Sequence, residues 1–257
     1  MKKNHIDISI ALVTWNRVKY LEIGLKALLH ALSPELRHEI LIMDNASTDG
    51  TLELVKGIAQ ANKEIKVFSN TKNIGFVAYN KLFFKARGDV IIEVDDDVIS
   101  FPHKFDKKLK ECLEKYFDYG FIALDTIRNE YTDGGRPNAG SGRIDKRDSF
   151  IVEEGDARGY CAAFRRKDYR LIRPLTWFFP FSLEHPQDYV ISGLMRRILK
   201  RKSGVLIDEK CLHANGPLYA KKFGRVDFDI TKMKNAKCED RVAKYIEAMN
   251  EGRVYSP

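Results

Sequence analysis

The chain has 257 residues, with 44 Lys and Arg against 36 Asp and Glu, a formal net charge of +8, and 44% hydrophobic residues. This composition excludes a disordered chain, because enough apolar surface is present to offset the entropy of ordering. No run approaches the roughly 18 uncharged apolar residues of a membrane span, and Met1 to Asp7 does not resemble a signal peptide, so we expect a cytoplasmic protein. The positive charge fits an anionic partner. We expect no nucleic acid, because the basic residues form no recognisable reading module.

The first half of the chain alternates short apolar runs with segments of helical periodicity. Apolar runs predict strands at 8–13, 40–43, 65–69 and 90–94. Helical spacing predicts helices at 18–32, at 52–59 with Ser47 and Thr48 as caps, from about Gly75 to a left-handed stop at Gly88, and from Pro102 to Tyr116. Strands that alternate with helices in this way predict an α/β fold, a mostly parallel sheet with helices on both faces.

The pattern changes beyond about residue 125. The segment 125–142 is rich in glycine and predicts a mobile loop, 171–183 is irregular and aromatic, and strands are expected at 159–165 and 204–208. Helices are expected at 188–200 and 235–250. We interpret residues 1–257 as a single domain: about 1–100 holds the sheet, about 101–234 completes a cleft, and about 235–257 adds a C-terminal helix.

Polar residues follow each predicted strand of the first half. In an open parallel sheet the ligand binds at the carboxyl ends of the strands, so these residues are candidates for a site. The sharpest signal is Asp95-Asp96-Asp97, which follows the apolar run at 90–94. Three adjacent carboxylates repel one another, and a divalent cation that prefers oxygen ligands offsets that repulsion. Asp95 and Asp97 point the same way if the chain stays extended, and Asp96 points elsewhere. The alternative is an exposed acidic turn.

Four motifs occur in order: VTWNR at 13–17, IMDNASTDGT at 42–51, NIGFVAYN at 73–80 and GDVIIEVDDDV at 88–98. As a set they resemble the nucleotide-sugar-binding half of a family 2 glycosyltransferase of the GT-A fold, over about residues 8–100. The resemblance implies donor-binding roles for Thr14, Trp15, Asn16, Asp44, Asn73, Gly75, Asp95 and Asp96. In this comparison Trp15 stands where the family usually has Tyr and stacks on the nucleobase. The alternatives are an ordinary core aromatic for Trp15 and a turn with a helix cap for 44–49.

The resemblance also implies catalytic and metal-binding residues. Asp97, with help from Asp95 and His213 in the segment CLHANGP, is expected to hold a divalent cation, Mn or Mg. Asp188 matches the catalytic base of inverting members, although Gln187 replaces the usual Glu, and Glu184 and His185 are alternatives. A helix N-cap is the structural alternative for Asp188.

The function that the resemblance implies is metal-dependent, inverting transfer of a sugar from a nucleoside diphosphate sugar, UDP-sugar being favoured, to a saccharide or glycolipid acceptor. Surface polysaccharide or glycolipid synthesis is the expected setting. A catalytically inactive nucleotide-sugar binder and a nucleotidyltransferase are the alternatives. The cationic segment 221–225 either closes over the diphosphate or forms a solvated surface.

A membrane contact is a separate expectation from the residues. The basic cluster at 196–202 and the aromatic run at 177–181 fit a peripheral contact with an anionic membrane at its inner face. A packed lid for the aromatic residues and a solvated face for the charges is the alternative.

Overall fold

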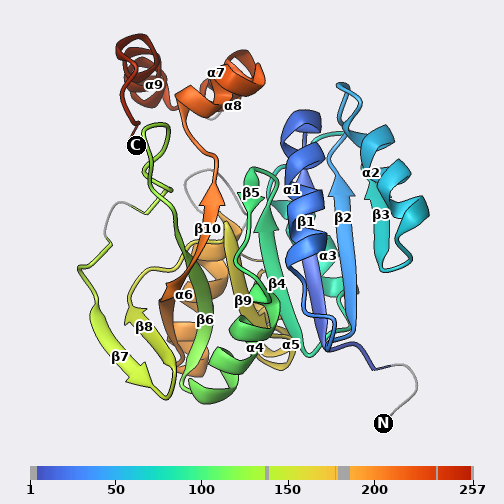
Figure 1. Cartoon of the computed structure of the whole chain (residues 1–257), viewed down its shortest axis with the longest axis vertical. Coiled ribbons are helices and arrows are strands. Elements are labelled where there is room, and N and C mark those ends of the chain that lie inside the picture. The colour runs from blue at the N-terminus through green and yellow to red at the C-terminus, as the bar shows by residue number, and fades with distance from the viewer. Residues whose placement is uncertain (1–4, 137–138, 177, 179–185, 236, 256–257) are drawn as a thin grey trace.

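A computed structural model describes residues 5–136, 139–176, 178, 186–235 and 237–255 (Figure 1). Its centre is a ten-stranded mixed sheet in the order β3-β2-β1-β4-β9-β6-β10-β8-β7, and β5 pairs with β10 beside this path. The strands are β1 (Ile8–Thr14), β2 (His38–Asp44), β3 (Ile65–Ser69), β4 (Val90–Asp95), β5 (Val98–Ser100), β6 (Tyr119–Thr126), β7 (Arg143–Arg147), β8 (Phe150–Glu154), β9 (Cys161–Arg165) and β10 (Lys202–His213). The predicted α/β architecture with a mostly parallel sheet is confirmed.

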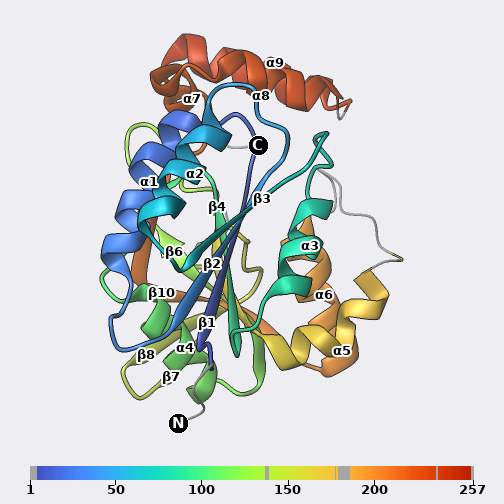
Figure 2. The ribbon, with the colours of Figure 1, turned by 90° about the vertical axis from the view of Figure 1, so that its right-hand side faces the viewer.

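Helices cover both faces of this sheet, with α1 and α2 on one side and α3, α5 and α6 on the other (Figure 2). The helices are α1 (Val18–Ala31), α2 (Thr51–Ala61), α3 (Val77–Lys85), α4 (Phe105–Lys115), α5 (Arg166–Thr176), α6 (Gln187–Leu199), α7 (Pro217–Phe223), α8 (Val226–Asn235) and α9 (Glu239–Glu251). In the described part of the chain, none is long and apolar enough to cross a bilayer.

The strand register aligns the polar strand ends. β1 pairs in parallel with β2, and Thr14 lies opposite Asp44 at the last step of the ladder. On the other side of β1, Val13 lies opposite Asp95 of β4. Because both ladders end at the same level, the residues that follow β1, β2 and β4 meet at one edge of the sheet. This edge is the carboxyl edge, where the sequence places the candidate site.

The opposite edge of the sheet is held by a buried glutamate. Glu39 of β2 accepts hydrogen bonds from Ser9 Oγ at 2.7 Å, from the Arg87 N–H at 2.7 Å and from Lys66 Nζ at 2.8 Å. Burial opposes the charge on Glu39, yet these donors outweigh burial and lower its pKa to about 2. Gly88 lies against β1, the strand that carries Ser9: a Cβ at position 88 would be 2.4 Å from the backbone N of Ser9. This contact explains a glycine at position 88, because any side chain would push β1 away.

Several predicted local features are wrong. Gly88 does not terminate a helix in the left-handed conformation: α3 ends at Lys85, and its C-terminal cap, Ala86, is extended. Ser47 and Thr48 do not cap α2. The Asp49 carboxylate instead accepts the Thr51 N–H at 3.0 Å, and Ser47 Oγ accepts a hydrogen bond from the Asn16 N–H at 2.9 Å.

The second half contains more regular structure than the sequence indicates. Residues 171–176, predicted irregular, belong to α5, which buries Tyr169 and Ile172 under an otherwise charged surface. Strands β6, β7 and β8 have no counterpart in the prediction. The predicted loop at 125–142 begins within β6, and its other described residues contain turns and one isolated bridge, between Asn129 and Thr132.

The last helices cross over the carboxyl edge of the sheet, above α1 in both views (Figures 1 and 2). A small apolar cluster joins them to the body: Tyr20 of α1 packs with Ala214 and Tyr219, against Ile99 and Phe223. The predicted helix at 235–250 corresponds to α9, and α8, which precedes it, has no counterpart in the prediction. The C-terminal segment therefore forms a roof over the strand ends.

Candidate active site

A cavity of about 420 Å³ lies at the carboxyl edge, between the strand ends and α8. Its wall brings together most of the residues that the sequence predicts. Predicted residues on the wall are Thr14, Trp15, Asn73, Gly75, Asp95, Asp96, Asp97 and His213. Arg225, from the predicted cationic segment 221–225, is also on the wall. Residues that were not assigned a role are Val13, Arg17, Asn45, Phe76, Tyr79 and Lys232.

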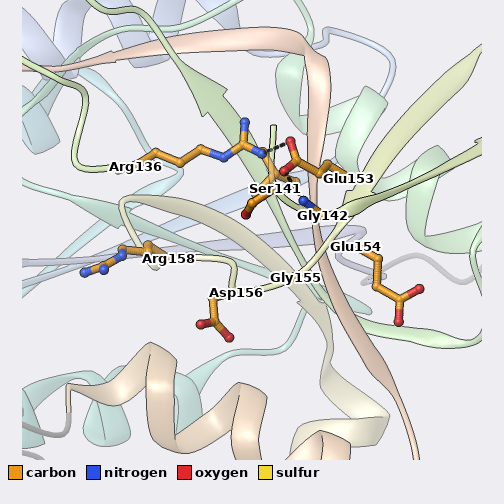
Figure 3. Close-up of a pocket in the computed structure, with 9 residues that line it drawn as sticks. Arg136, Ser141, Gly142, Glu153, Glu154, Gly155, Asp156 and Arg158 are labelled. Atoms are coloured by element: carbon orange, nitrogen blue, oxygen red, sulfur yellow. Dashed lines mark hydrogen bonds and ion pairs between the residues drawn. The ribbon is translucent and has the colours of Figure 1, made fainter. Parts of the chain in front are cut away.

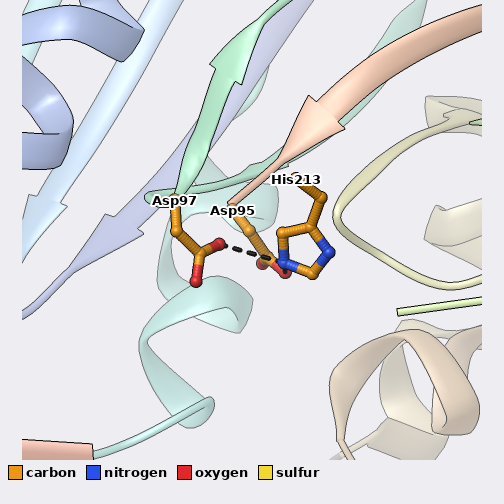
Figure 4. A group of neighbouring side chains, drawn as sticks. All are labelled: Asp95, Asp97 and His213. Carbon is orange, nitrogen blue, oxygen red and sulfur yellow. Dashed lines mark ion pairs between the residues drawn. The ribbon is translucent and has the colours of Figure 1, made fainter. Parts of the chain in front are cut away.

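Asp95, Asp97 and His213 converge at this cavity (Figure 4). One ligand atom from each lies within 4.8 Å of the others. His213 Nε2 is 3.1 Å from Asp97 Oδ1 and 3.9 Å from Asp95 Oδ2. On the other side of the ring, Nδ1 is 3.2 Å from the carbonyl oxygen of Gly134. That contact favours the proton on Nδ1 and leaves Nε2 facing the carboxylates, as in metal-binding histidines whose other ring nitrogen donates to a carbonyl oxygen.

The charges of this group are strongly perturbed. Burial, and next the neighbouring Asp97, raise the pKa of Asp95 above its ordinary value. Burial also disfavours the charge on Asp97, but His213 and Arg17 outweigh it and hold the pKa of Asp97 well below its usual range. For His213, burial works against the charge and the Asp97 carboxylate raises the pKa. Opposed shifts in adjacent acidic groups are typical of functional sites.

Arg17 is the cation nearest to the acidic run. Its Nε lies 3.3 Å from Asp96 Oδ1, and its Nη2 lies 3.3 Å from Asp97 Oδ2. Asp96 also accepts the backbone N–H of Trp15 at 3.3 Å. Asp96 thus points toward β1 while Asp95 and Asp97 face His213, as predicted, although a turn at 96–97 produces this divergence and not an extended chain.

Two predicted donor-binding residues, Asn16 and Asp44, lie behind the cavity wall. Asn16 has a positive φ of 52°, and its side-chain oxygen accepts the Thr48 N–H at 2.7 Å. Asp44 Oδ2 accepts the Ser47 N–H at 3.1 Å. Within the described residues, the other Asp44 oxygen is buried and has no hydrogen-bond partner. Both residues therefore shape the loops that carry the wall.

Asn45 is a positioning residue that the sequence analysis missed. Its side-chain NH₂ donates to Asn73 Oδ1 at 2.8 Å and to the Gly75 carbonyl at 3.2 Å. Its oxygen accepts the Ile74 N–H at 3.1 Å. These bonds fix the loop before α3, where Gly75 adopts a φ of 61° that favours glycine. The signal was present, since Asn45 follows Asp44 directly at a strand end.

The C-terminal segment contributes Arg225, from the predicted cationic segment, together with Phe228 and Lys232, which no sequence motif identifies. Arg225 donates to the carbonyl oxygens of Trp15, at 3.1 Å, and of Asn16. The rings of Trp15 and Phe228 meet edge to face with centroids 6.0 Å apart. Lys232 Nζ lies 5.3 Å from the ring centroid of Phe76. Of the predicted cationic segment 221–225, Arg225 is the residue on the wall of this cavity.

Asp188 lies at the start of α6 and is 9% exposed. Its Oδ2 accepts the Gly159 N–H at 2.7 Å, and its Oδ1 accepts the Tyr189 N–H at 2.8 Å. Burial raises its pKa, and its negative charge is among those that raise the pKa of Asp95. The N-cap of α6 is Pro186, so the alternative of Asp188 as the helix N-cap is wrong. Asp188 lies within electrostatic range of the acidic cluster. The alternatives Glu184 and His185 lie outside the described residues.

Gln187 has a specific partner. Its side-chain NH₂ donates to Glu93 Oε1, and both residues are buried. Burial, followed by the charge of Asp188, raises the pKa of Glu93 well above its ordinary value. An uncharged glutamine in place of the usual glutamate avoids a second carboxylate against Glu93.

A second cavity, of about 300 Å³, lies between the glycine-rich segment and the turn before β9 (Figure 3). Arg136 reaches across it to Glu153 and also pairs with Asp125 at 2.6 Å. Arg158 and Asp156 lie on its other side. Because Arg158 directly precedes Gly159, this polar cavity adjoins the backbone group that holds Asp188.

The fold and this site define a class. A mixed sheet with parallel strands β3-β2-β1-β4, acidic groups after β4 and a closing histidine is the GT-A glycosyltransferase architecture, and solved structures of that class superpose on the chain. A Pyrobaculum calidifontis mannosyltransferase in complex with GDP-Man and Mn²⁺ matches with a TM-score of 0.62 and 16% identity, covering 99% of this chain and 67% of that one. Residues 1–349 of S. aureus TarS in complex with UDP match with a TM-score of 0.57 and 15% identity, covering 96% and 72%.

The sequence comparison identifies the family. The family described as "Glycosyl transferase family 2" matches residues 9–172, more than half of the chain, and the chain belongs to it. An uncharacterized glycosyltransferase of Haemophilus influenzae is 28% identical over 124 residues, 46% of this chain and 49% of that protein. A Methanococcus voltae dolichyl N-acetyl-alpha-D-glucosaminyl phosphate 3-beta-D-2,3-diacetamido-2,3-dideoxy-beta-D-glucuronosyltransferase is 34% identical over 87 residues, 33% of this chain and 27% of that protein. The chain thus spans about half or less of the curated relatives that it matches.

Proposed function

We propose that this protein is a metal-dependent, inverting glycosyltransferase that moves a sugar from a nucleoside diphosphate sugar to an acceptor hydroxyl. The observation that carries the proposal is the convergence of Asp95, Asp97 and His213 on the wall of the cavity at the carboxyl edge. We further propose that residues 1–257 act as one unit, because α8 completes the wall that the first strands begin.

The donor is proposed to bind in the 420 Å³ cavity. Trp15 offers an aromatic face for the nucleobase, with Asn73 and Gly75 below it. Arg17 and Lys232 supply positive charge on the wall, suited to a diphosphate. We favour a UDP-sugar. The mannosyltransferase of similar fold was solved with GDP-Man, so the identity of the base is a point for experiment.

The residues present fit a divalent cation. Two carboxylates and one imidazole, with Nδ1 of His213 anchored on a carbonyl, form a donor set that suits Mn²⁺ or Mg²⁺. Asp97 and His213 would hold the ion, with Asp95 beside them. When bound, the ion neutralises negative charge on the departing diphosphate. Arg17 is positioned to share that task, since it already contacts Asp97.

Asp188 is the proposed catalytic base. Its carboxylate would take the proton of the acceptor hydroxyl as that oxygen attacks the anomeric carbon, while the bond to the diphosphate oxygen breaks on the opposite face. This displacement inverts the configuration. The bonds from Gly159 and Tyr189 hold the carboxylate in place, and the raised pKa makes it a stronger base than an exposed aspartate.

The acceptor is proposed to be a saccharide or glycolipid in surface polysaccharide or glycolipid synthesis. The 300 Å³ cavity beside Gly159 is the candidate place for it, because its charged and polar lining suits sugar hydroxyls. The Methanococcus voltae relative is named for transfer to a dolichyl-phosphate-linked sugar, which is an acceptor of the glycolipid class.

Thermal unfolding with a panel of nucleotides and nucleotide-sugars, with and without Mn²⁺, tests the donor proposal. A ligand at about one hundred times its Kd stabilises the folded state by about 2.7 kcal/mol, which raises the melting temperature by several degrees. We expect the largest shift for one nucleoside diphosphate and its sugar, only with metal, and lost in Asp97→Ala. Equal shifts for nucleoside triphosphates would favour a nucleotidyltransferase. Donor binding without hydrolysis or transfer would favour an inactive binder.

A further inference from the structure

The outer face of α3 and α5 combines exposed apolar and basic side chains. Leu171 of α5 and Phe178, which follows α5 and whose N–H bonds the Leu175 carbonyl at 3.0 Å, are 66% and 78% exposed. On α3, Phe84 is 64% exposed. Large side chains this exposed are unusual when they occur together, and such patches mark interaction surfaces.

Basic residues surround these apolar side chains. Lys167 and Arg170 are exposed on α5, where Lys167 lies one turn before Leu171 and Arg170 directly precedes it. Lys81 and Lys85 are exposed on α3, three residues before Phe84 and directly after it. The outer sides of α3 and α5 are in contact, because the Arg173 guanidinium lies 4.9 Å from the ring centroid of Phe84. We call this surface the α3–α5 face.

Acidic residues do not neutralise the α3–α5 face. Within α3 and α5, both fully described, the only acidic residue is Asp168, which is buried and paired with Arg165 at 3.2 Å. Asp89 and Glu114 share a cavity with Lys167 and Arg170 at the edge of the face. Each has another cation as partner: Arg166 lies 3.6 Å from Asp89, and Lys110 lies 2.6 Å from Glu114.

We propose that the α3–α5 face binds the surface of an anionic membrane, with Leu171, Phe178 and Phe84 entering the interface and the surrounding lysines and arginines contacting acidic headgroups. A helix with apolar and basic side chains on one outward face is typical of interfacial binding. A second copy of the chain is a poor partner, because it would bring the same cations face to face.

The location of the face suits an acceptor held in a membrane. α3 starts directly after Gly75 and Phe76 of the donor cavity, and α5 is the helix before α6, which carries Asp188 (Figure 2). The basic cluster at 196–202 is less available than the sequence indicates. Arg196 pairs with Asp156, Arg201 bonds the Phe117 carbonyl, and Lys202 pairs with Glu154. Of the aromatic run, Phe178 is exposed, and Trp177 and residues 179–181 lie outside the described residues.

Vesicle cosedimentation of the full chain tests this proposal without reference to catalysis, so its failure leaves the proposed function untouched. We expect binding to phosphatidylcholine vesicles that contain phosphatidylglycerol, weakened by salt, and no binding to phosphatidylcholine alone. Lys167→Gln with Arg170→Gln should weaken the partition coefficient roughly thirtyfold, at about 1 kcal/mol per charge. Leu171→Ser with Phe178→Ser should weaken it at least about tenfold.

Matched variants on other surfaces serve as controls. Phe117, which belongs to neither α3 nor α5, is 69% exposed, and Phe117→Ser should leave binding unchanged. Arg197→Gln with Lys200→Gln, exposed on α6, should also leave it unchanged. The melting temperature of each variant reports whether it folds, which exposed substitutions should allow. Four results would overturn the proposal. Two concern the variants: vesicle binding at the wild-type level by the Lys167/Arg170 and Leu171/Phe178 variants, or loss of vesicle binding in the Arg197/Lys200 variant. The others are equal binding to uncharged vesicles, and self-association that the Leu171 and Phe178 changes abolish.

Discussion

Replacing Asp188 by Asn separates its two roles, because the substitution affects each by a different amount. Each carboxylate oxygen accepts one backbone N–H, Oδ2 from Gly159 and Oδ1 from Tyr189. An asparagine has one acceptor oxygen, so its NH₂ group must face one of these N–H groups. One buried hydrogen bond is then lost, at about 1–3 kcal/mol of the free energy of unfolding. That is a decrease in melting temperature of several degrees.

The catalytic effect of Asp188→Asn is expected to be larger and specific to transfer. Loss of a general base lowers the transfer rate by roughly 100- to 10000-fold, while donor affinity stays within a factor of a few. Transfer kinetics, donor titration by calorimetry and thermal unfolding measure the three quantities on one sample. Wild-type transfer should also fall on acidification at a pH above the ordinary carboxyl range, because burial raises the pKa of Asp188. The residual activity of the variant should lack this dependence.

Asp168 provides the control, since it is also buried and lies in the first turn of the neighbouring α5. Asp168→Asn should lower the melting temperature without a specific loss of transfer. If Asp188→Asn transfers sugar within about tenfold of wild type, Asp188 is a structural residue at the start of a helix and the assignment of the base is wrong.

Three further substitutions test the proposed metal site and the opposite edge of the sheet, where Gly88 and Glu39 lie. Asp97→Ala should abolish Mn²⁺ binding measured by calorimetry, and unchanged affinity would refute the metal assignment. Gly88→Ala should lower the free energy of unfolding in urea by roughly 1–3 kcal/mol, because the added Cβ would lie 2.4 Å from Ser9 N. Gly57→Ala is the control: open space surrounds Gly57, so this change should stabilise α2 slightly. The pKa of Glu39 is lowered from 4.5 to about 2, so its ionised carboxylate adds about 3 kcal/mol to the free energy of unfolding. This contribution is complete above pH 4.5 and is lost as the pH falls toward 2. Glu39→Gln should remove this loss of stability in acid, and the same dependence of stability on pH in the variant and the wild type would contradict the argument.

The sequence predicts the strands of the first half well, because buried parallel strands are continuous apolar runs with polar residues at their ends. That pattern also locates Asp95 and Asp97. Local rules fail where a distant contact decides the conformation. Gly88 has the position of a helix stop, yet its reason for being glycine is Ser9, which lies far earlier in the chain.

The rest of the site depends on contacts that no local pattern encodes. Lys232 and Phe228 lie on a helix with no buried residue, so its periodicity carries little signal. Arg225 reaches the carbonyl of Trp15 across 210 positions of sequence. The strand at 143–147 is mostly exposed and polar, and the short strand at 150–154 that pairs with it is held in the sheet by β10.

The roof formed by α7, α8 and α9 has a consequence for how far relatives can inform on this protein. The family match ends at residue 172, before His213, Arg225 and Lys232, which complete the cavity wall. The matched part supplies the acidic run and every strand of the sheet except β10, and the part beyond residue 172 adds β10 and closes over them. Donor preference can therefore diverge through changes in the last fifty residues while the sheet remains intact. Chimeras that exchange this segment between relatives would show how much of the specificity it controls.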